Sequence, residues 1–141
     1  MKERPFGNKT TTVSEIGLGT WQLGGDWGSV TDRAAEAILQ TAVDHGVTFF
    51  DTADVYGGGV SEQRIARFLQ QYDGRVFVAT KLGRSGDPGW PDNFTMATMR
   101  QHTEDSLRRL QVEALDLTQL HCIPTEELRR GDVFDHLRTF Q

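Results

Sequence analysis

The chain has 141 residues, which is about the size of one domain. Its hydrophobic fraction of 37% and charged fraction of 25% are ordinary for a globular protein, and no apolar stretch is long enough to span a membrane. The formal net charge of −5 argues against nucleic acid as a partner, and the single cysteine excludes an internal disulfide and a multi-cysteine zinc site. Because the first residues lack the apolar segment of a signal peptide, we expect a cytoplasmic protein. We also expect no membrane partner and no metal.

The amino-terminal third predicts a hairpin, a strand and a helix, in that order. Residues 3–13 (ERPFGNKTTTV) are typical of two short strands around a Gly-Asn turn, and residues 14–20 (SEIGLGT) predict a further strand. A glycine-rich loop over 21–30 leads to a helix that begins near Thr31, a good N-cap residue, and ends before Gly46. The apolar face of this helix is expected to contain Ala35, Ile38, Leu39 and Ala42.

The rest of the chain repeats the order strand, loop, helix. Strands are predicted over 47–51, 76–81 and 115–121, each followed by a loop that leads to a helix. These helices begin near Ser61, near Thr95 and near Asp132. The expected buried positions are Ile65, Phe68 and Leu69 on the first of these three helices and Met99, Thr103, Leu107 and Leu110 on the second.

Strands that alternate with helices predict an α/β fold with a parallel sheet. Four such units are half of a (β/α)8 barrel, which usually takes about 250 residues. We therefore expect a segment of a longer chain, or a half-barrel that pairs with another molecule. The edges of an unclosed sheet also favour self-association.

Four polar residues lie where the apolar runs VTFFD, VFVATK and LDLTQLH end. Asp51, Lys81 and His121 close the three runs, and Tyr56 follows Asp51 by five residues. The carboxyl ends of parallel strands lie at one face of a barrel, so these side chains are expected to converge there.

A carboxylate, a phenol, an ammonium and an imidazole together are suited to donating a proton to a carbonyl oxygen. A phenol usually titrates near pH ~10, and a neighbouring ammonium stabilises its phenolate form. A histidine donates a hydrogen bond that orients the substrate oxygen. Since no side chain supplies a hydride, reduction of the carbonyl requires a nicotinamide cofactor.

The segments GLGTWQLGG, FFDTADVYGGGVSE, VFVATKLG and LDLTQLH resemble, in order and spacing, the aldo-keto reductase family. The resemblance covers essentially the whole chain and implies that residues 1–141 are the N-terminal half of a (β/α)8 barrel, with the hairpin on its floor. It implies NADP(H)-dependent reduction of a small aldehyde or ketone. By this resemblance, Tyr56 is the proton donor, Lys81 and Asp51 tune it, and His121 lines the substrate site. The residues implied next to the cofactor are Gly19, Thr20, Trp21 and Asp51, and Trp21 and Tyr56 are also implied to contact the substrate.

Two other functions are compatible with the sequence. A barrel aldolase would use Lys81 as a Schiff-base nucleophile. A half-barrel without reductase activity would self-associate, or would be a regulatory relative that keeps the fold and senses nucleotide. Away from the site, we expect Cys122 to be a small buried residue and the helix arginines to be solvated, namely Arg64, Arg67, Arg108, Arg109, Arg129 and Arg130.

Overall fold

The computed structural model describes residues 1–7 and 11–140 and has two sheets. A two-stranded antiparallel sheet pairs β1 (Glu3–Phe6) with β2 (Thr11–Ser14), as predicted. The Gly-Asn turn predicted between them includes Asn8, which lies outside the described residues. The second sheet is parallel, in the order β3 (Leu18–Gly19), β4 (Phe49–Asp51), β5 (Phe77–Leu82) and β6 (Leu117–Leu120).

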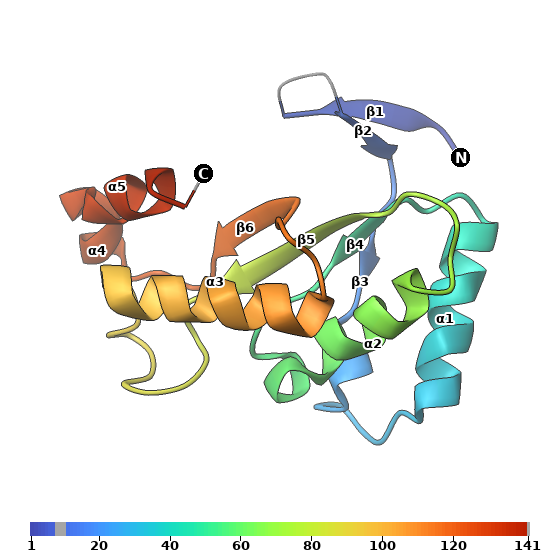
Figure 1. The fold of residues 1–141 in the computed structure, drawn as a ribbon, viewed down its shortest axis with the longest axis horizontal. Helices are drawn as coiled ribbons and strands as arrows, with labels where there is room; N and C mark the ends of the chain where they lie inside the picture. The colour runs from blue at the N-terminus through green and yellow to red at the C-terminus, as the bar shows by residue number, and fades with distance from the viewer. Residues whose placement is uncertain (8–10, 141) are drawn as a thin grey trace.

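Helices follow each strand of the parallel sheet (Figure 1). The α-helices are α1 (Asp32–Asp44), α2 (Val60–Leu69), α3 (Met96–Leu110), α4 (Thr125–Arg130) and α5 (Asp132–Arg138). Two 3₁₀ helices, η1 (Trp21–Gly24) and η2 (Tyr56–Gly59), lie in the loops after β3 and β4. This is the hairpin and four βα units of the (β/α)8 barrel architecture. Within residues 1–7 and 11–140, no helix is both long and apolar enough to cross a membrane.

The main core lies between the sheet and its covering helices. Phe50 of β4 and Val78 of β5 face this core. They meet apolar residues from three helices, which are Ala35, Leu39, Val43, Ile65, Phe68 and Leu110. Alternation along a strand then directs the neighbouring residues of β4 and β5 to the opposite, inner face of the sheet.

The hairpin covers the amino end of the parallel sheet, as the family resemblance implies (Figure 1). Phe6 of β1 packs against Phe49 at a ring-centroid distance of 5.7 Å and against Phe77 at 5.2 Å. Phe49 and Phe77 are stacked on each other at 5.6 Å. Since these two residues begin β4 and β5, the aromatic cluster closes one end of the sheet and leaves the carboxyl end for the polar residues.

Two of the predicted helix starts are confirmed in atomic detail. The hydroxyl of Thr31 accepts a hydrogen bond from the backbone N–H of Ala34, and the hydroxyl of Thr95 accepts one from Thr98. Gly46 follows the end of α1 with a φ of 82°, a left-handed conformation that glycine adopts without strain.

Several expectations about burial were wrong. Ile38 is 37% exposed, because it lies over the open edge of β3 beside Ile16 and Leu18. On α3, Thr103 and Leu107 are only partly buried and line a cavity beside β6, whereas His102 and Ser106 take buried positions. The buried face of α3 is therefore more polar than the apolar periodicity indicated.

Other expectations about individual elements also need correction. The first strand of the parallel sheet is confined to Leu18–Gly19, because β4, its single partner among the described residues, is itself only three residues long. The segment after His121, expected as a loop, contains α4. Cys122 is exposed, because its backbone adopts a positive φ of 55° directly after β6 and turns away from the sheet.

Candidate active site

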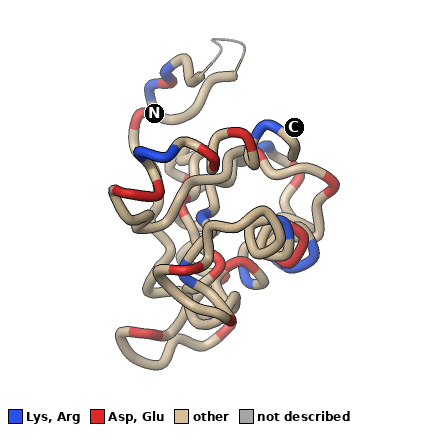
Figure 2. Tube along the Cα trace, turned by 90° about the vertical axis from the view of Figure 1, so that its left-hand side faces the viewer, with Lys and Arg blue, Asp and Glu red and all other residues tan. Residues whose placement is uncertain are grey.

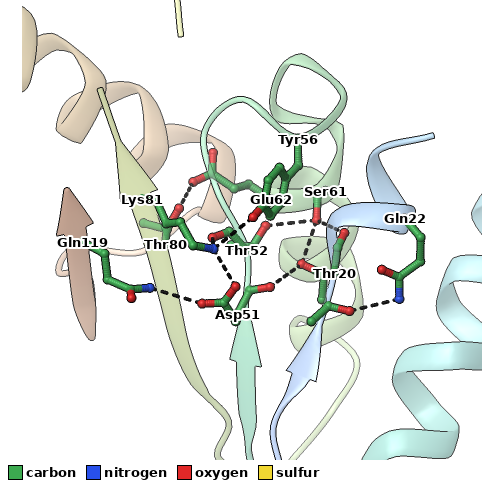
Figure 3. Close-up of polar contacts among 11 residues, drawn as sticks. Thr20, Gln22, Asp51, Thr52, Tyr56, Ser61, Glu62, Thr80, Lys81 and Gln119 are labelled. Carbon is green, nitrogen blue, oxygen red and sulfur yellow. Dashed lines mark hydrogen bonds and ion pairs between the residues drawn. The ribbon is translucent and has the colours of Figure 1, made fainter. Parts of the chain in front are cut away.

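Inward-facing residues at the carboxyl ends of the parallel strands form the candidate site (Figure 3). In the register of the sheet, Asp51 pairs with Ala79 and Lys81 pairs with Gln119. Because alternate residues of a strand share a face, Phe49 and Asp51 of β4 point the same way, as do Ala79 and Lys81 of β5. The sheet thus places a carboxylate and an ammonium on neighbouring strands, at its inner face.

The ammonium of Lys81 connects the cluster. Its Nζ donates to Asp51 Oδ1 at 2.5 Å, to the backbone oxygen of Thr52 at 2.7 Å and to the hydroxyl of Tyr56 at 3.1 Å. Only 15% of the Lys81 side chain is exposed. The structure therefore brings together three of the four residues that the sequence singled out.

His121 approaches the same cluster from the end of β6. Its ring meets the Tyr56 ring edge-on, with centroids 5.9 Å apart, and its Nδ1 has no hydrogen-bond partner among the described residues. Burial lowers the pKa of His121 to about 4, and the positive charges of Lys81 and Arg84 act in the same direction. The imidazole is consequently neutral at pH 7.

Gln119 is a fifth member of the cluster that the sequence reasoning missed. Its side-chain amide donates to Asp51 Oδ2 at 3.2 Å, so the two oxygens of Asp51 have different partners (Figure 3). The signal was present in the sequence, because Gln119 precedes His121 by two residues in a strand and so shares its face.

The residues implied to adjoin a cofactor differ in how accessible they are. Gly19 and Trp21 are exposed, and Trp21 stacks on Tyr56 with ring centroids 5.5 Å apart. Thr20 is fully buried, and its hydroxyl donates to the backbone oxygen of Asp51 at 2.9 Å. The hydroxyl of Ser61 donates to Thr20 at 3.0 Å, which ties α2 to the base of the site.

A second polar layer lies on the helix side of the sheet. Glu62 of α2 is fully buried, and it accepts hydrogen bonds from Thr80 at 2.6 Å and from Arg109 at 2.5 Å. Arg109 and Arg64 were expected to be solvated, and that was wrong. The buried carboxylate of Glu62 requires a charged partner, which Arg109 supplies, and Arg64 donates hydrogen bonds to the backbone oxygens of Leu23 and Val30.

Asp54 is an unpaired carboxyl in the turn before Tyr56. It is 1% exposed, and neither of its oxygens has a hydrogen-bond partner among the described residues. The nearest basic group is Nδ1 of the buried His102, 3.7 Å away. Burial, and then the negative charge of Glu62, raise the pKa of Asp54 to about 7.

Comparison with known proteins identifies the family that this chain resembles. The model of the aldo/keto reductase family matches residues 15–141. The aldo-keto reductase YhdN of Bacillus subtilis is 36% identical over 127 residues, which cover 82% of this chain and 37% of the relative.

Solved structures of similar proteins agree with this match. An aldo-keto reductase of Bacillus halodurans, AKR11C1 in its holo form, superposes with a TM-score of 0.80 at 33% identity over 99% of this chain and 47% of its own. An aldo/keto reductase of Klebsiella pneumoniae in complex with NADP and acetate has a TM-score of 0.74 at 30% identity, over 93% and 42% of the two chains. The chain thus spans less than half the length of each of these proteins.

Proposed function

Because the chain belongs to the aldo/keto reductase family, we propose that it acts in the NADPH-dependent reduction of aldehyde or ketone carbonyls to alcohols in the cytoplasm. The observation that carries the proposal is the position of Lys81 Nζ, which contacts both Asp51 Oδ1 and the hydroxyl of Tyr56. The similar proteins are oxidoreductases by name, and one was solved with NADP.

In the proposed reaction, Tyr56 donates a proton to the carbonyl oxygen. Lys81 donates a hydrogen bond to the phenolic oxygen, so the hydrogen of the phenol is free for the substrate. As the proton leaves, the ammonium stabilises the phenolate that remains. Asp51, at 2.5 Å, pairs with that ammonium and holds it in place.

His121 orients the carbonyl oxygen in this proposal. A neutral imidazole, which its lowered pKa of about 4 ensures at pH 7, offers one N–H donor without placing another positive charge beside Lys81. The two donors, from Tyr56 and His121, come from neighbouring rings and are suited to one oxygen atom.

The exposed residues beside the cluster fit a nicotinamide ring. Gly19 and Trp21 leave accessible surface next to Asp51 and Tyr56, and the buried Thr20 fixes the backbone between them. We propose that Gly19, Thr20, Trp21 and Asp51 hold the nicotinamide end of NADP(H), as the family resemblance implies. The cofactor supplies the hydride when it is bound.

The geometry of Lys81 favours proton transfer over Schiff-base chemistry. A lysine nucleophile has to be neutral to attack a carbonyl. Asp51 favours the ammonium form of Lys81, and Thr52 accepts a further hydrogen bond from it. The aldolase function therefore has less support than the reductase function.

Replacing Tyr56 by Phe tests the proposal. The assay follows NADPH oxidation with small aldehydes, on the 141-residue chain and on the longest natural polypeptide that contains it. Tyr56→Phe removes the proton donor, so turnover should fall by roughly 10²–10⁴-fold while NADPH affinity is retained. Tyr72→Phe, which changes the other tyrosine of the chain, is the matched control and should leave turnover unchanged. Full turnover in Tyr56→Phe, or no turnover in either unmodified protein, would refute the proposal.

A further inference from the structure

The loop between β3 and α1 lies against the turn that carries Tyr56. Trp21 of η1 is stacked on the Tyr56 ring, with centroids 5.5 Å apart and ring planes inclined by 14°. On its other side, Trp21 contacts Trp27 at 4.9 Å. The orientation of the Tyr56 ring thus depends on where this loop holds Trp21.

One carboxylate connects the loop to the turn. Asp26 Oδ2 accepts a hydrogen bond from the indole N–H of Trp21 at 3.0 Å and another from the backbone N–H of Gly57 at 3.1 Å. The first donor belongs to the ring that stacks on Tyr56, and the second belongs to the residue that follows Tyr56. A single oxygen atom therefore fixes the stacked ring and the adjoining backbone together.

The surrounding backbone leaves little freedom elsewhere in the loop. A Cβ atom at Gly57 would collide with the carbonyl group of Gly24, so η1 and η2 are in direct backbone contact. Arg64 of α2 donates to the backbone oxygens of Leu23 at 2.5 Å and of Val30 at 2.7 Å. These contacts hold the loop on both sides of Asp26, whose own hydrogen bonds fix its middle.

We propose that Asp26 is a positioning residue that sets the orientation of the Tyr56 phenol through Trp21 and Gly57. This inference rests on the proposed function, in which Tyr56 gives up a proton. Lys81 holds the hydroxyl end of the phenol, and Asp26 holds the ring face and the peptide that follows. With the contacts of Lys81 and Asp26 both in place, the O–H bond of the phenol points in one direction.

The first test measures the loop alone and requires no activity. In a Trp27→Phe, Trp90→Phe background, Trp21 is the remaining tryptophan, and quenching of its fluorescence by acrylamide, an uncharged quencher, reports its exposure. Asp26→Ala should raise the quenching constant about twofold, because the indole loses its hydrogen-bond partner. Asp73→Ala, which removes an exposed carboxylate from the turn before β5, is the control and should leave quenching unchanged. Equal quenching in Asp26→Ala and the unmodified background would overturn the proposal.

The second test measures turnover in the otherwise unmodified protein. Asp26→Ala should lower kcat by roughly 5–20-fold, as expected for the loss of two hydrogen bonds, and should leave NADPH affinity nearly unchanged. Asp26→Asn retains one acceptor oxygen and should give an intermediate kcat.

A double-mutant cycle separates positioning from a general structural effect. Trp21→Phe keeps an aromatic ring but removes the indole donor, so Asp26→Ala should cost less in that background than alone. Additive effects, or a fall in thermal midpoint that parallels the fall in kcat, would overturn the positioning role. If the unmodified protein shows no turnover, the proposed function fails, and the quenching result still decides whether Asp26 holds the ring.

Discussion

Two carboxyl groups three residues apart, one at the end of β4 and one in the loop after it, have opposite environments. Asp51 has the ammonium of Lys81 at 2.5 Å and an amide donor from Gln119. Asp54 is buried, with no hydrogen-bond partner among the described residues, and the carboxylate of Glu62 acts on it unfavourably. Asp51 is therefore a paired carboxylate at the inner face of the sheet, whereas Asp54 is a buried carboxyl group with a raised pKa.

Asp54 should make the stability of the chain fall as pH rises. Its pKa is raised from 3.8 to about 7 on folding, so between these values the folded chain holds a proton that the unfolded chain has lost. Stability is lost as pH increases from about 4 to about 7 and is level above that range. Burial lowers the pKa of His102, so the contribution of His102 to stability has the opposite sign and is lost as pH falls through the ordinary histidine value of 6.5.

Asp54→Asn should remove this pH dependence. Relative to the variant, the unmodified chain should lose about 2–3 kcal/mol of unfolding free energy between pH 5 and pH 8. Urea titrations of both proteins at the two pH values provide the measurement. A constant difference between them would show that Asp54 titrates normally.

At the scale of elements, the buried carboxylate of Glu62 joins α2 to β5 and α3. Glu62 on α2 accepts from Thr80 on β5 and from Arg109 on α3, and its side chain is fully buried. The helices therefore meet through charge as well as through the apolar core. Removal of one partner leaves an uncompensated charge, which costs more than an exposed ion pair contributes.

Two adjacent arginines allow a matched comparison. Arg109→Ala should lower the unfolding free energy by about 3 kcal/mol, because Glu62 is left buried and unpaired. Arg108, which precedes it on α3, pairs with Asp105 and is 68% exposed, so Arg108→Ala should cost less than about 1 kcal/mol. Chemical denaturation of both variants decides the point, and similar losses for the two would contradict this account of the pair.

The elements were predictable where a local signal was strong. Thr31 and Thr95 are helix caps in both the sequence and the structure, since N-capping depends on a few adjacent residues. The convergence of Asp51, Lys81 and His121 was predictable because alternation and strand ends are also local features.

What the sequence did not reveal depends on contacts between distant segments. Arg109 is 47 residues from its partner Glu62, and its burial follows from how α2 packs on α3. Ile38 was predicted to be buried and is exposed for the same kind of reason. It lies over the open edge of β3, and its burial depends on which segments pack there. Asp26 carries no motif at all, and its role emerges only when η1 and η2 are seen in contact.

At the scale of the molecule, both edges of the parallel sheet are open among the described residues. Among the described residues, β3 and β6 each pair along one edge only. Cavities of about 560 Å³ beside β3 and about 540 Å³ beside β6 flank these edges. Acidic and basic residues are interspersed along the backbone trace (Figure 2).

We expect the 141-residue chain to self-associate through these edges. Ile16 and Ile38 are exposed beside β3, so Ile16→Lys together with Ile38→Lys should increase the monomer fraction. Leu128→Lys, on the exposed face of α4, is the control. Light scattering gives the mass in each case. A monomeric unmodified chain would contradict self-association, and an unchanged mass in the double variant would show that the β3 edge is not the contact.

The most direct test of the central claim follows a labelled hydride. The protein is incubated with NADPH deuterated at the transferable position and an aromatic aldehyde, and the alcohol is analysed by mass spectrometry. We predict one deuterium on the former carbonyl carbon, and a yield at least about 10²-fold lower for Lys81→Met, which removes the ammonium beside Tyr56. No deuterated alcohol from the unmodified protein, or an equal yield from Lys81→Met, would contradict the account.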